Sequence, residues 1–272
     1  MIKIIDLDSL FDKFITDYVY ENVGKINPEE IEDKIPEFYT AFGDKNLQEL
    51  DGFTPNTYYL QFDVQTLLGA LKSHIENDVS VSDFLCEAIL KSEGVNAQII
   101  KTLYQENSEE FVLYLLNMLN DTNGKIPYER LIEFISYDYS SPIKELSTEI
   151  LSQAVNDCLD SVIDAYNNAS IEVRAYLTEI LSHSKRDDRV FEILTREFIL
   201  NQEEIPIYAS YLSRYGDEKA LSILLEAIEK EKISYPDFEE LKFAIESLGG
   251  EYTKVRDFTK DKLYKKIHAK QN

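Results

Sequence analysis

Hydrophobic residues recur along nearly the whole chain at the three- and four-residue spacing of an amphipathic α-helix, and strand-like alternation is scarce. This pattern predicts about fifteen helices of roughly 10–16 residues, joined by connections of only a few residues. Clear examples are 67–76, 81–91, 109–120, 128–137 and 143–153. Because short helices with short connections pack antiparallel on their neighbours, we expect an all-α protein built from helix pairs.

Helix starts are well marked. Asn27 is followed by Pro28 and Glu30, a cap residue with proline at the first helical position and glutamate three residues after the cap. Ser141 and Pro142 repeat the combination of cap and proline. Most of the 9 Gly and 7 Pro fall between the periodic stretches, which supports the division into many short helices.

An internal repeat suggests how these helices are organised. The segment 143–152 aligns thirty positions later with 173–182, and five of the ten aligned positions are identical. Further helix–turn–helix units follow at similar spacing. A period of this length is typical of proteins built from stacked helix pairs.

Three stretches resemble HEAT-like repeats of the phycobilisome-lyase type. In 170–175, Val-Arg precedes an Ala- and Leu-rich stripe, and 208–221 has an Ala-rich helix, a Gly-Asp turn and an Ala-Leu opening of the next helix. The segment 186–194 is a degenerate form of the same turn and helix. Gly216 is expected in a left-handed helix cap and Asp217 is expected to cap the next helix. The resemblance covers about 140–250 and departs from the pattern near His183, where the turn lacks glycine.

The resemblance implies a right-handed α–α superhelix, that is, a HEAT-like solenoid. We expect residues 1–62 to form a helical N-terminal cap, 63–252 to form the HEAT-like repeats, and 253–272 to form a basic C-terminal helix or tail. Solenoids need such caps because their terminal apolar faces would otherwise be exposed. Tetratricopeptide repeats are the alternative architecture, since their period is similar.

The charge of the chain changes the range of expected partners. The formal net charge is −23, which argues against a nucleic-acid partner, because a phosphate backbone would be repelled. The basic segment is 253–272, which is either a solvated helix or a docking tail for an acidic partner. Its seven cations are Lys254, Arg256, Lys260, Lys262, Lys265, Lys266 and Lys270.

Nothing in the sequence indicates export or membrane insertion. The longest apolar stretches fall well short of the ~20 residues of a membrane helix, and the opening apolar run meets Asp6 and Asp8 at once. We therefore expect a cytoplasmic protein with no membrane partner. Cys86 and Cys158 lie in apolar helical patterns and are expected to be reduced core residues.

Motifs for catalysis or cofactor binding are missing from the sequence. The three histidines, His74, His183 and His268, are far apart and are expected at the surface or at helix ends, and there is no HExxH, CxxC, EF-hand loop, P-loop, GxGxxG or GxSxG. The sequence therefore predicts no catalytic residue, no metal and no cofactor.

The excess of tyrosine is more informative. The chain has 18 Tyr and no Trp, and tyrosine is favoured at protein-binding surfaces. In HEAT-type repeats the second helix of each pair lines the concave face, and the resemblance places six candidate partner-binding residues there: Lys144, Arg174, Tyr176, Tyr208, Tyr211 and Arg214. The alternative is that the tyrosines are core residues with their hydroxyls at the edge, and that Arg174 bridges neighbouring repeats or binds a carboxylate such as Glu179 or Asp188.

The leading hypothesis is a non-catalytic scaffold or adaptor that binds a protein or peptide on the concave face. The second is an enzyme on a HEAT scaffold, resembling either the alkylpurine DNA glycosylases or the bilin lyases. Net charge and the lack of Trp argue against the glycosylase version. A third is a subunit that only associates with itself.

Overall fold

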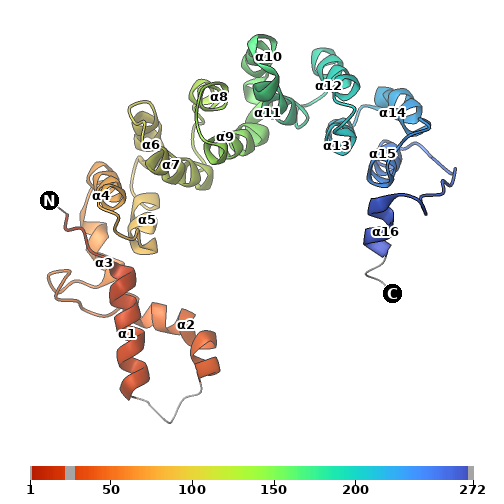
Figure 1. Cartoon of the computed structure of the whole chain (residues 1–272). Helices are drawn as coiled ribbons and strands as arrows, with labels where there is room; N and C mark the ends of the chain where they lie inside the picture. The colour runs from red at the N-terminus through yellow and green to blue at the C-terminus, as the bar shows by residue number, and fades with distance from the viewer. Residues whose placement is uncertain (1, 22–27, 269–272) are drawn as a thin grey trace. The chain divides into compact units, whose positions relative to one another are not determined.

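The computed structural model describes residues 2–21 and 28–268, and every regular element in these residues is helical (Figure 1). There are sixteen α-helices and three short 3-10 helices in this part of the chain. The all-α class is therefore confirmed. The described helices include none that is both long and apolar enough to cross a membrane.

The chain divides into two compact units, and the boundary lies between Pro127 and Tyr128. We call the part up to Pro127 unit 1 and the part from Tyr128 unit 2. This boundary falls inside the segment 63–252, so the compact units do not coincide with the three segments expected from the sequence. That division into cap, repeats and tail stays a prediction.

In unit 1, the first helices pack on the ones that follow. The ring of Phe84 stacks on Tyr39 at 4.9 Å and meets Phe42 at 6.2 Å. His74 lies in the last turn of its helix, as expected, but it is buried, and its Nε2 is 3.3 Å from the Ile5 carbonyl. The α-helices are α1 (Leu7–Glu21), α2 (Pro28–Gly43), α3 (Pro55–Tyr58), α4 (Val64–Glu76), α5 (Asp83–Leu90), α6 (Val95–Leu103) and α7 (Glu109–Asp121).

Unit 2 consists mainly of successive helix pairs. Its helices are α8 (Tyr128–Ser136), α9 (Ser141–Ala154), α10 (Leu159–Asn168), α11 (Ile171–Leu181), α12 (Asp188–Leu200), α13 (Ile205–Tyr215), α14 (Leu221–Ile228), α15 (Tyr235–Ser247) and α16 (Lys262–His268). Within this unit, α8 packs on α9, α10 on α11, α12 on α13 and α14 on α15 (Figure 1). The second helices also pack on one another, α9 on α11 and α13 on α15.

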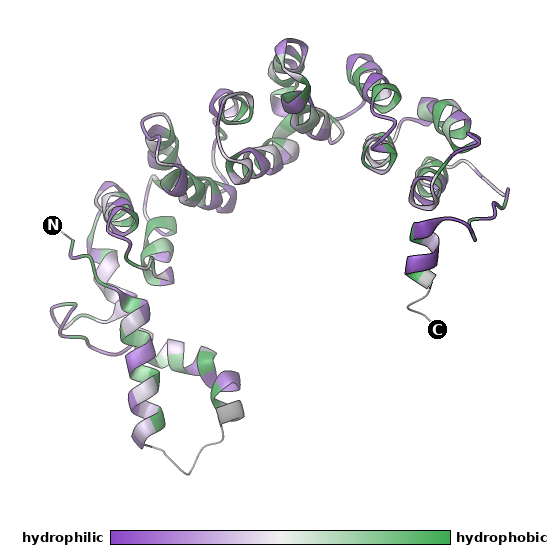
Figure 2. Ribbon diagram, viewed as in Figure 1, coloured by the Kyte–Doolittle hydropathy of each residue, from purple (hydrophilic) through white to green (hydrophobic). Residues whose placement is uncertain are grey.

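The thirty-residue repeat is also a structural one. Ile143 and Val173 are both buried, and so are four further aligned pairs: Ser147 and Leu177, Thr148 and Thr178, Ile150 and Ile180, Leu151 and Leu181. Positions thirty residues apart therefore have the same place in α9 and α11. Figure 2 shows hydrophobic and hydrophilic residues mixed along the helices of unit 2, as amphipathic helices require.

The expected helix-end signals are confirmed at Gly216 and Asp217. Gly216 ends α13 in the left-handed region, with φ 78°, and Asp217 accepts a hydrogen bond from the Lys219 amide. The cap of α9 is Ser140 rather than Ser141, one residue before the expected position. Asn27 lies outside the described residues. Cys86 is half-buried and Cys158 is buried, and both are free thiols.

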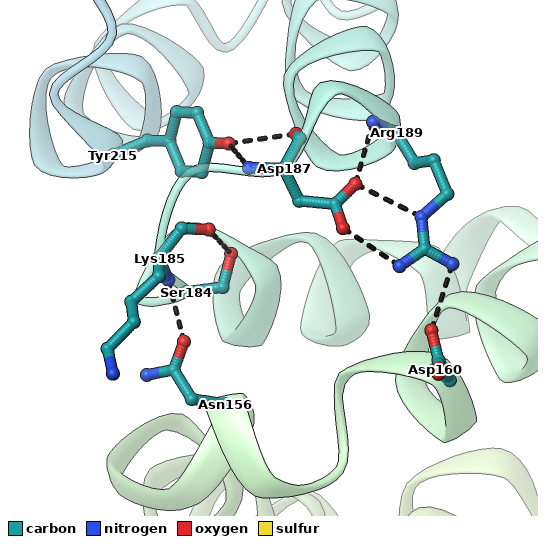
Figure 3. Close-up of polar contacts among 7 residues, drawn as sticks. All are labelled: Asn156, Asp160, Ser184, Lys185, Asp187, Arg189 and Tyr215. Carbon is teal, nitrogen blue, oxygen red and sulfur yellow. Dashed lines mark hydrogen bonds and ion pairs between the residues drawn. The ribbon is translucent and has the colours of Figure 1, made fainter.

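The turn without glycine after α11 is held by side chains from the neighbouring helix pairs (Figure 3). Asn156, which follows α9, accepts a hydrogen bond of 2.7 Å from the Lys185 amide. From the other side, the hydroxyl of Tyr215 accepts from the Asp187 amide at 2.6 Å and donates to the Asp187 carbonyl at 2.9 Å. No described residue of this turn has a positive φ, so the turn does not need the glycine that the Gly216 turn needs.

A cluster of two ion pairs, both made by Arg189, lies at the end of the same turn (Figure 3). Arg189, in the first turn of α12, binds Asp187 at 2.8 Å and Asp160 of α10 at 2.9 Å. The hydrogen bond from Arg189 is the main cause that lowers the pKa of Asp187. The cluster is exposed, so we expect it to add little stability of its own.

Candidate functional site

The second helices of three successive pairs line a hollow of about 550 Å³, which we call the α9–α11 hollow. Its lining residues are Glu145, Thr148, Glu149, Ser152 and Gln153 from α9, Tyr176, Glu179 and His183 from α11 and the turn after it, and Arg214 from α13. All of them belong to unit 2.

Helix geometry explains why these residues meet. The other four residues of α9 stand three, four, seven and eight positions after Glu145, so all five lie on one face of the helix. Tyr176 and Glu179 likewise share one face of α11, being three positions apart, and His183 follows in the turn after the helix. Glu149 and Glu179 are equivalent positions of the repeat. The hollow is therefore formed where one face of α9 approaches the corresponding face of α11.

The hollow is mainly acidic. Three carboxylates, of Glu145, Glu149 and Glu179, stand against the single guanidinium of Arg214. Burial, and then the charge of Arg214, lower the pKa of His183, which keeps this imidazole neutral near pH 7.

The cation of Arg214 is held by its neighbours. Its Nη1 lies 3.0 Å from the hydroxyl of Ser182 and 3.0 Å from Nε2 of His183. Its guanidinium stands over the Tyr211 ring, 5.4 Å from the centroid. The hydroxyl of Tyr211 is 3.5 Å from the Glu179 carboxylate. These contacts join Tyr211 and Arg214 of α13 to residues 32 positions earlier, in α11 and directly after it.

Two of the six candidate residues, Tyr176 and Arg214, line the α9–α11 hollow, and Tyr211 adjoins it through Glu179. Burial, followed by the charge of Glu179, raises the pKa of Tyr211. Lys144 is half-buried on α9 and is not among the lining residues.

The other two candidates lie elsewhere. Tyr208 is only 5% exposed and packs as a core residue, with its ring 5.6 Å from that of Tyr211. Arg174 turns back to α10, where its Nε donates to the Tyr166 carbonyl at 3.3 Å and its guanidinium stands over the Tyr166 ring. Arg174 therefore joins the two helices of its own pair.

Residue types pointed to α9 only through Lys144, which does not line the hollow. The available signal was the polar spacing of Glu145, Glu149, Ser152 and Gln153 on the helix that repeats in α11.

Two cations of the C-terminal segment are engaged with unit 2. Lys254 binds Glu229 at 2.6 Å, and Arg256 donates to the Lys230 carbonyl at 2.5 Å. Lys270 lies outside the described residues, as does the side chain of His268. Within residues 2–21 and 28–268, no three His, Cys, Asp or Glu side chains gather closely enough to hold a metal ion.

Comparison with known proteins gives no family. No protein-family model matches the chain, and neither a curated protein nor a solved structure matches it.

Proposed function

We propose that the protein is a scaffold or adaptor that binds a segment of a protein partner on the second helices α9, α11 and α13. The observation that carries this proposal is the α9–α11 hollow, with Tyr176 and Arg214 in its lining. Its volume falls in the range of about 300–1,000 Å³ that is typical of ligand sites. Tyrosine and arginine are the residue types that most often anchor protein interfaces.

The proposal includes the finer architecture. The helix pairs of unit 2 form a right-handed HEAT-like superhelix whose concave face carries the hollow. Support comes from the thirty-residue equivalence of α9 and α11 and from contacts between neighbouring pairs at spacings of 28 to 32 residues. A scaffold of stacked repeats presents a row of helices to an extended partner.

An enzyme on the same scaffold is the weaker alternative. The acidic lining of the hollow disfavours a nucleic-acid substrate, which needs a basic surface. Self-association through the hollow is a second alternative, and the experiment below separates it from a foreign partner.

The test is affinity capture from the native host lysate with tagged wild type and with the double variant Tyr176→Ala/Arg214→Ala. A matched control is Tyr137→Ala/Arg196→Ala, since both residues are exposed and lie outside the hollow. Tyr208 is not used, because truncating a buried ring would destabilise the fold. Circular dichroism and thermal melting establish that each variant is folded.

We expect the wild type and the control to retain a protein partner in stoichiometric amount, and Tyr176→Ala/Arg214→Ala to lose it. The partner should also bind the purified wild type directly. Equal capture by all three proteins would contradict the proposed surface. Recovery of untagged copies of this chain alone would favour self-association.

A further inference from the structure

We propose that helix α16 of one copy of this chain packs on helix α2 of a second copy, so that the protein associates with itself head to tail. The two helices lie outside the α9–α11 hollow, and this inference goes beyond the proposed function. Three features carry it: the opposite charges of the two helices, their exposed apolar residues, and the way in which α16 is held on unit 2.

The two helices carry opposite charges in a chain that is strongly acidic. Residues 253–272 have seven cations and two acids, a net charge of +5. The whole chain carries −23, so residues 1–252 carry −28. Helix α2 contributes to this with five acids and one lysine, a net charge of −4. A second copy therefore offers the basic segment a complementary surface.

The charged side chains of both helices are exposed. Lys262, Lys265 and Lys266 stand three and four positions apart on one side of α16. Glu32 and Asp33 stand side by side in the sequence of α2. Among the described residues, none of these five side chains forms an ion pair. They are therefore available to pair with one another between two copies.

Each helix also exposes apolar side chains beside these charges. Leu263 and Ile267 are 49% and 48% exposed and stand four positions apart, so they share one side of α16. Ile35 of α2 is 42% exposed and follows Glu32 by three positions, so the two are neighbours on the helix surface. Packing these apolar residues together would remove them from water. Contact between the two helices thus satisfies the charges and the apolar residues at once.

Helix α16 is held on unit 2 by its remaining side. The ring of Tyr264 packs edge-on against that of Tyr235 in α15, with 4.9 Å between the centroids. Asp261 accepts hydrogen bonds from the Leu263 amide at 2.8 Å and from the Tyr235 amide at 3.2 Å. The helix is therefore positioned before it meets a partner, which lowers the entropy that binding costs.

The net charge sets the conditions under which this contact forms. Two copies of charge −23 repel each other at long range, but salt of about 0.15 M screens exposed charges that lie more than about 8 Å apart. Opposite charges in contact are much closer than this. We therefore expect a weak association at physiological salt, as small interfaces give, and its loss at high salt.

The experiment measures the average mass of the purified full chain by sedimentation velocity over a wide range of concentrations, in about 0.15 M salt. Lys262→Glu/Lys266→Glu reverses the charge of α16, and Glu32→Lys/Asp33→Lys reverses that of α2. The apolar contact is tested separately with Leu263→Ala. Circular dichroism establishes that each variant is folded.

Two control variants change the net charge by the same amounts at exposed residues outside both helices. They are Lys185→Glu/Lys232→Glu and Glu192→Lys/Glu203→Lys. A purely general effect of net charge would appear in these controls as strongly as in the reversal variants.

We expect the mass of the wild type and of both controls to rise with concentration. Each reversal variant alone should associate at least about tenfold more weakly, because like charges then face each other. Leu263→Ala should weaken the association several-fold, through the lost apolar contact. An equimolar mixture of the two reversal variants should associate again, because each helix then finds one of opposite charge on the other variant.

A wild type that stays monomeric at every concentration would overturn the inference. So would reversal variants that associate like their controls, or a mixture of the two that stays monomeric. None of these substitutions lies in the α9–α11 hollow. The proposed function is therefore tested independently, by the capture experiment with Tyr176→Ala/Arg214→Ala.

Discussion

The buried hydrogen bond between Tyr166 and Glu197 should contribute measurably to the stability of unit 2. Tyr166 of α10 is fully buried and its hydroxyl donates to the Glu197 carboxylate of α12, thirty-one residues later. Glu197 is 6% exposed and also accepts from the Asn201 amide at 3.0 Å. The bond thus joins the first helices of two successive pairs in an environment that largely excludes water.

The perturbation is Tyr166→Phe, which keeps the ring and removes only the donor. Hydrogen bonds to charged groups contribute about 1.5–3 kcal/mol, so we expect the free energy of unfolding to fall by about 2 kcal/mol. For a unit of this size, that corresponds to a melting temperature lower by about 4–8 °C. The contact with Arg174 should persist, because a phenylalanine ring also faces the guanidinium.

The assay is urea unfolding followed by circular dichroism, with hydrogen exchange of α10 and α12 to assign the transition to unit 2. Tyr137→Phe is the matched control, because Tyr137 is 67% exposed. We expect faster exchange in both helices of the Tyr166 variant. A midpoint equal to that of the control, or faster exchange confined to unit 1, would refute the reasoning.

The same bond predicts a dependence on alkaline pH. Burial, and then the hydrogen bond to Glu197, raise the pKa of Tyr166 from 10.0 to about 12. The unfolded chain therefore loses this proton first, and the contribution is complete below pH 10 and is lost as the pH rises towards 12. The stability difference between wild type and Tyr166→Phe should shrink over that window. A difference that stays constant to pH 12 would contradict the assigned cause.

Two further predictions concern glycine and histidine. Gly216→Ala should destabilise unit 2 by about 1 kcal/mol, because its φ of 78° is unfavourable for alanine. Gly69→Ala lies inside α4, where the added methyl group has open space, and should stabilise unit 1 by about 0.5–1 kcal/mol. Chemical denaturation measures both effects, and equal effects would contradict the left-handed assignment of Gly216. The pKa of His183 lies below 6.5, through burial and then Arg214, so the unfolded chain takes up this proton first and stability falls as the pH drops through that value. His183→Gln should flatten the loss between about pH 7 and pH 5, and an unchanged slope in pH-dependent melting would contradict the shift.

The helix pairs could be predicted from the sequence because their physical causes are local. The apolar spacing predicted the helices, and the sequence match between 143–152 and 173–182 predicted that α9 and α11 are equivalent. The left-handed residue at Gly216 followed from glycine before an aspartate cap. These features depend on neighbours within a few residues.

The hollow could not be predicted, because it depends on the rotation of each helix about its axis and on side chains a repeat away. Tyr208 and Tyr211 stand three residues apart, yet one is in the core and the other reaches Glu179. Glu145 and Glu149 are like many exposed glutamates in an acidic chain. The hydroxyl of Thr178 donates to the Arg174 carbonyl, whereas the Thr148 hydroxyl has no hydrogen-bond partner among the described residues. No sequence pattern encodes this difference.

The most direct test of the central claim is hydrogen exchange of the full chain with and without the purified captured partner. The account predicts added protection over 145–153 and 176–183 and around Arg214, which together line the α9–α11 hollow. Protection confined to the first helices α10 and α12, or to unit 1, would contradict the claim that the second helices hold the partner.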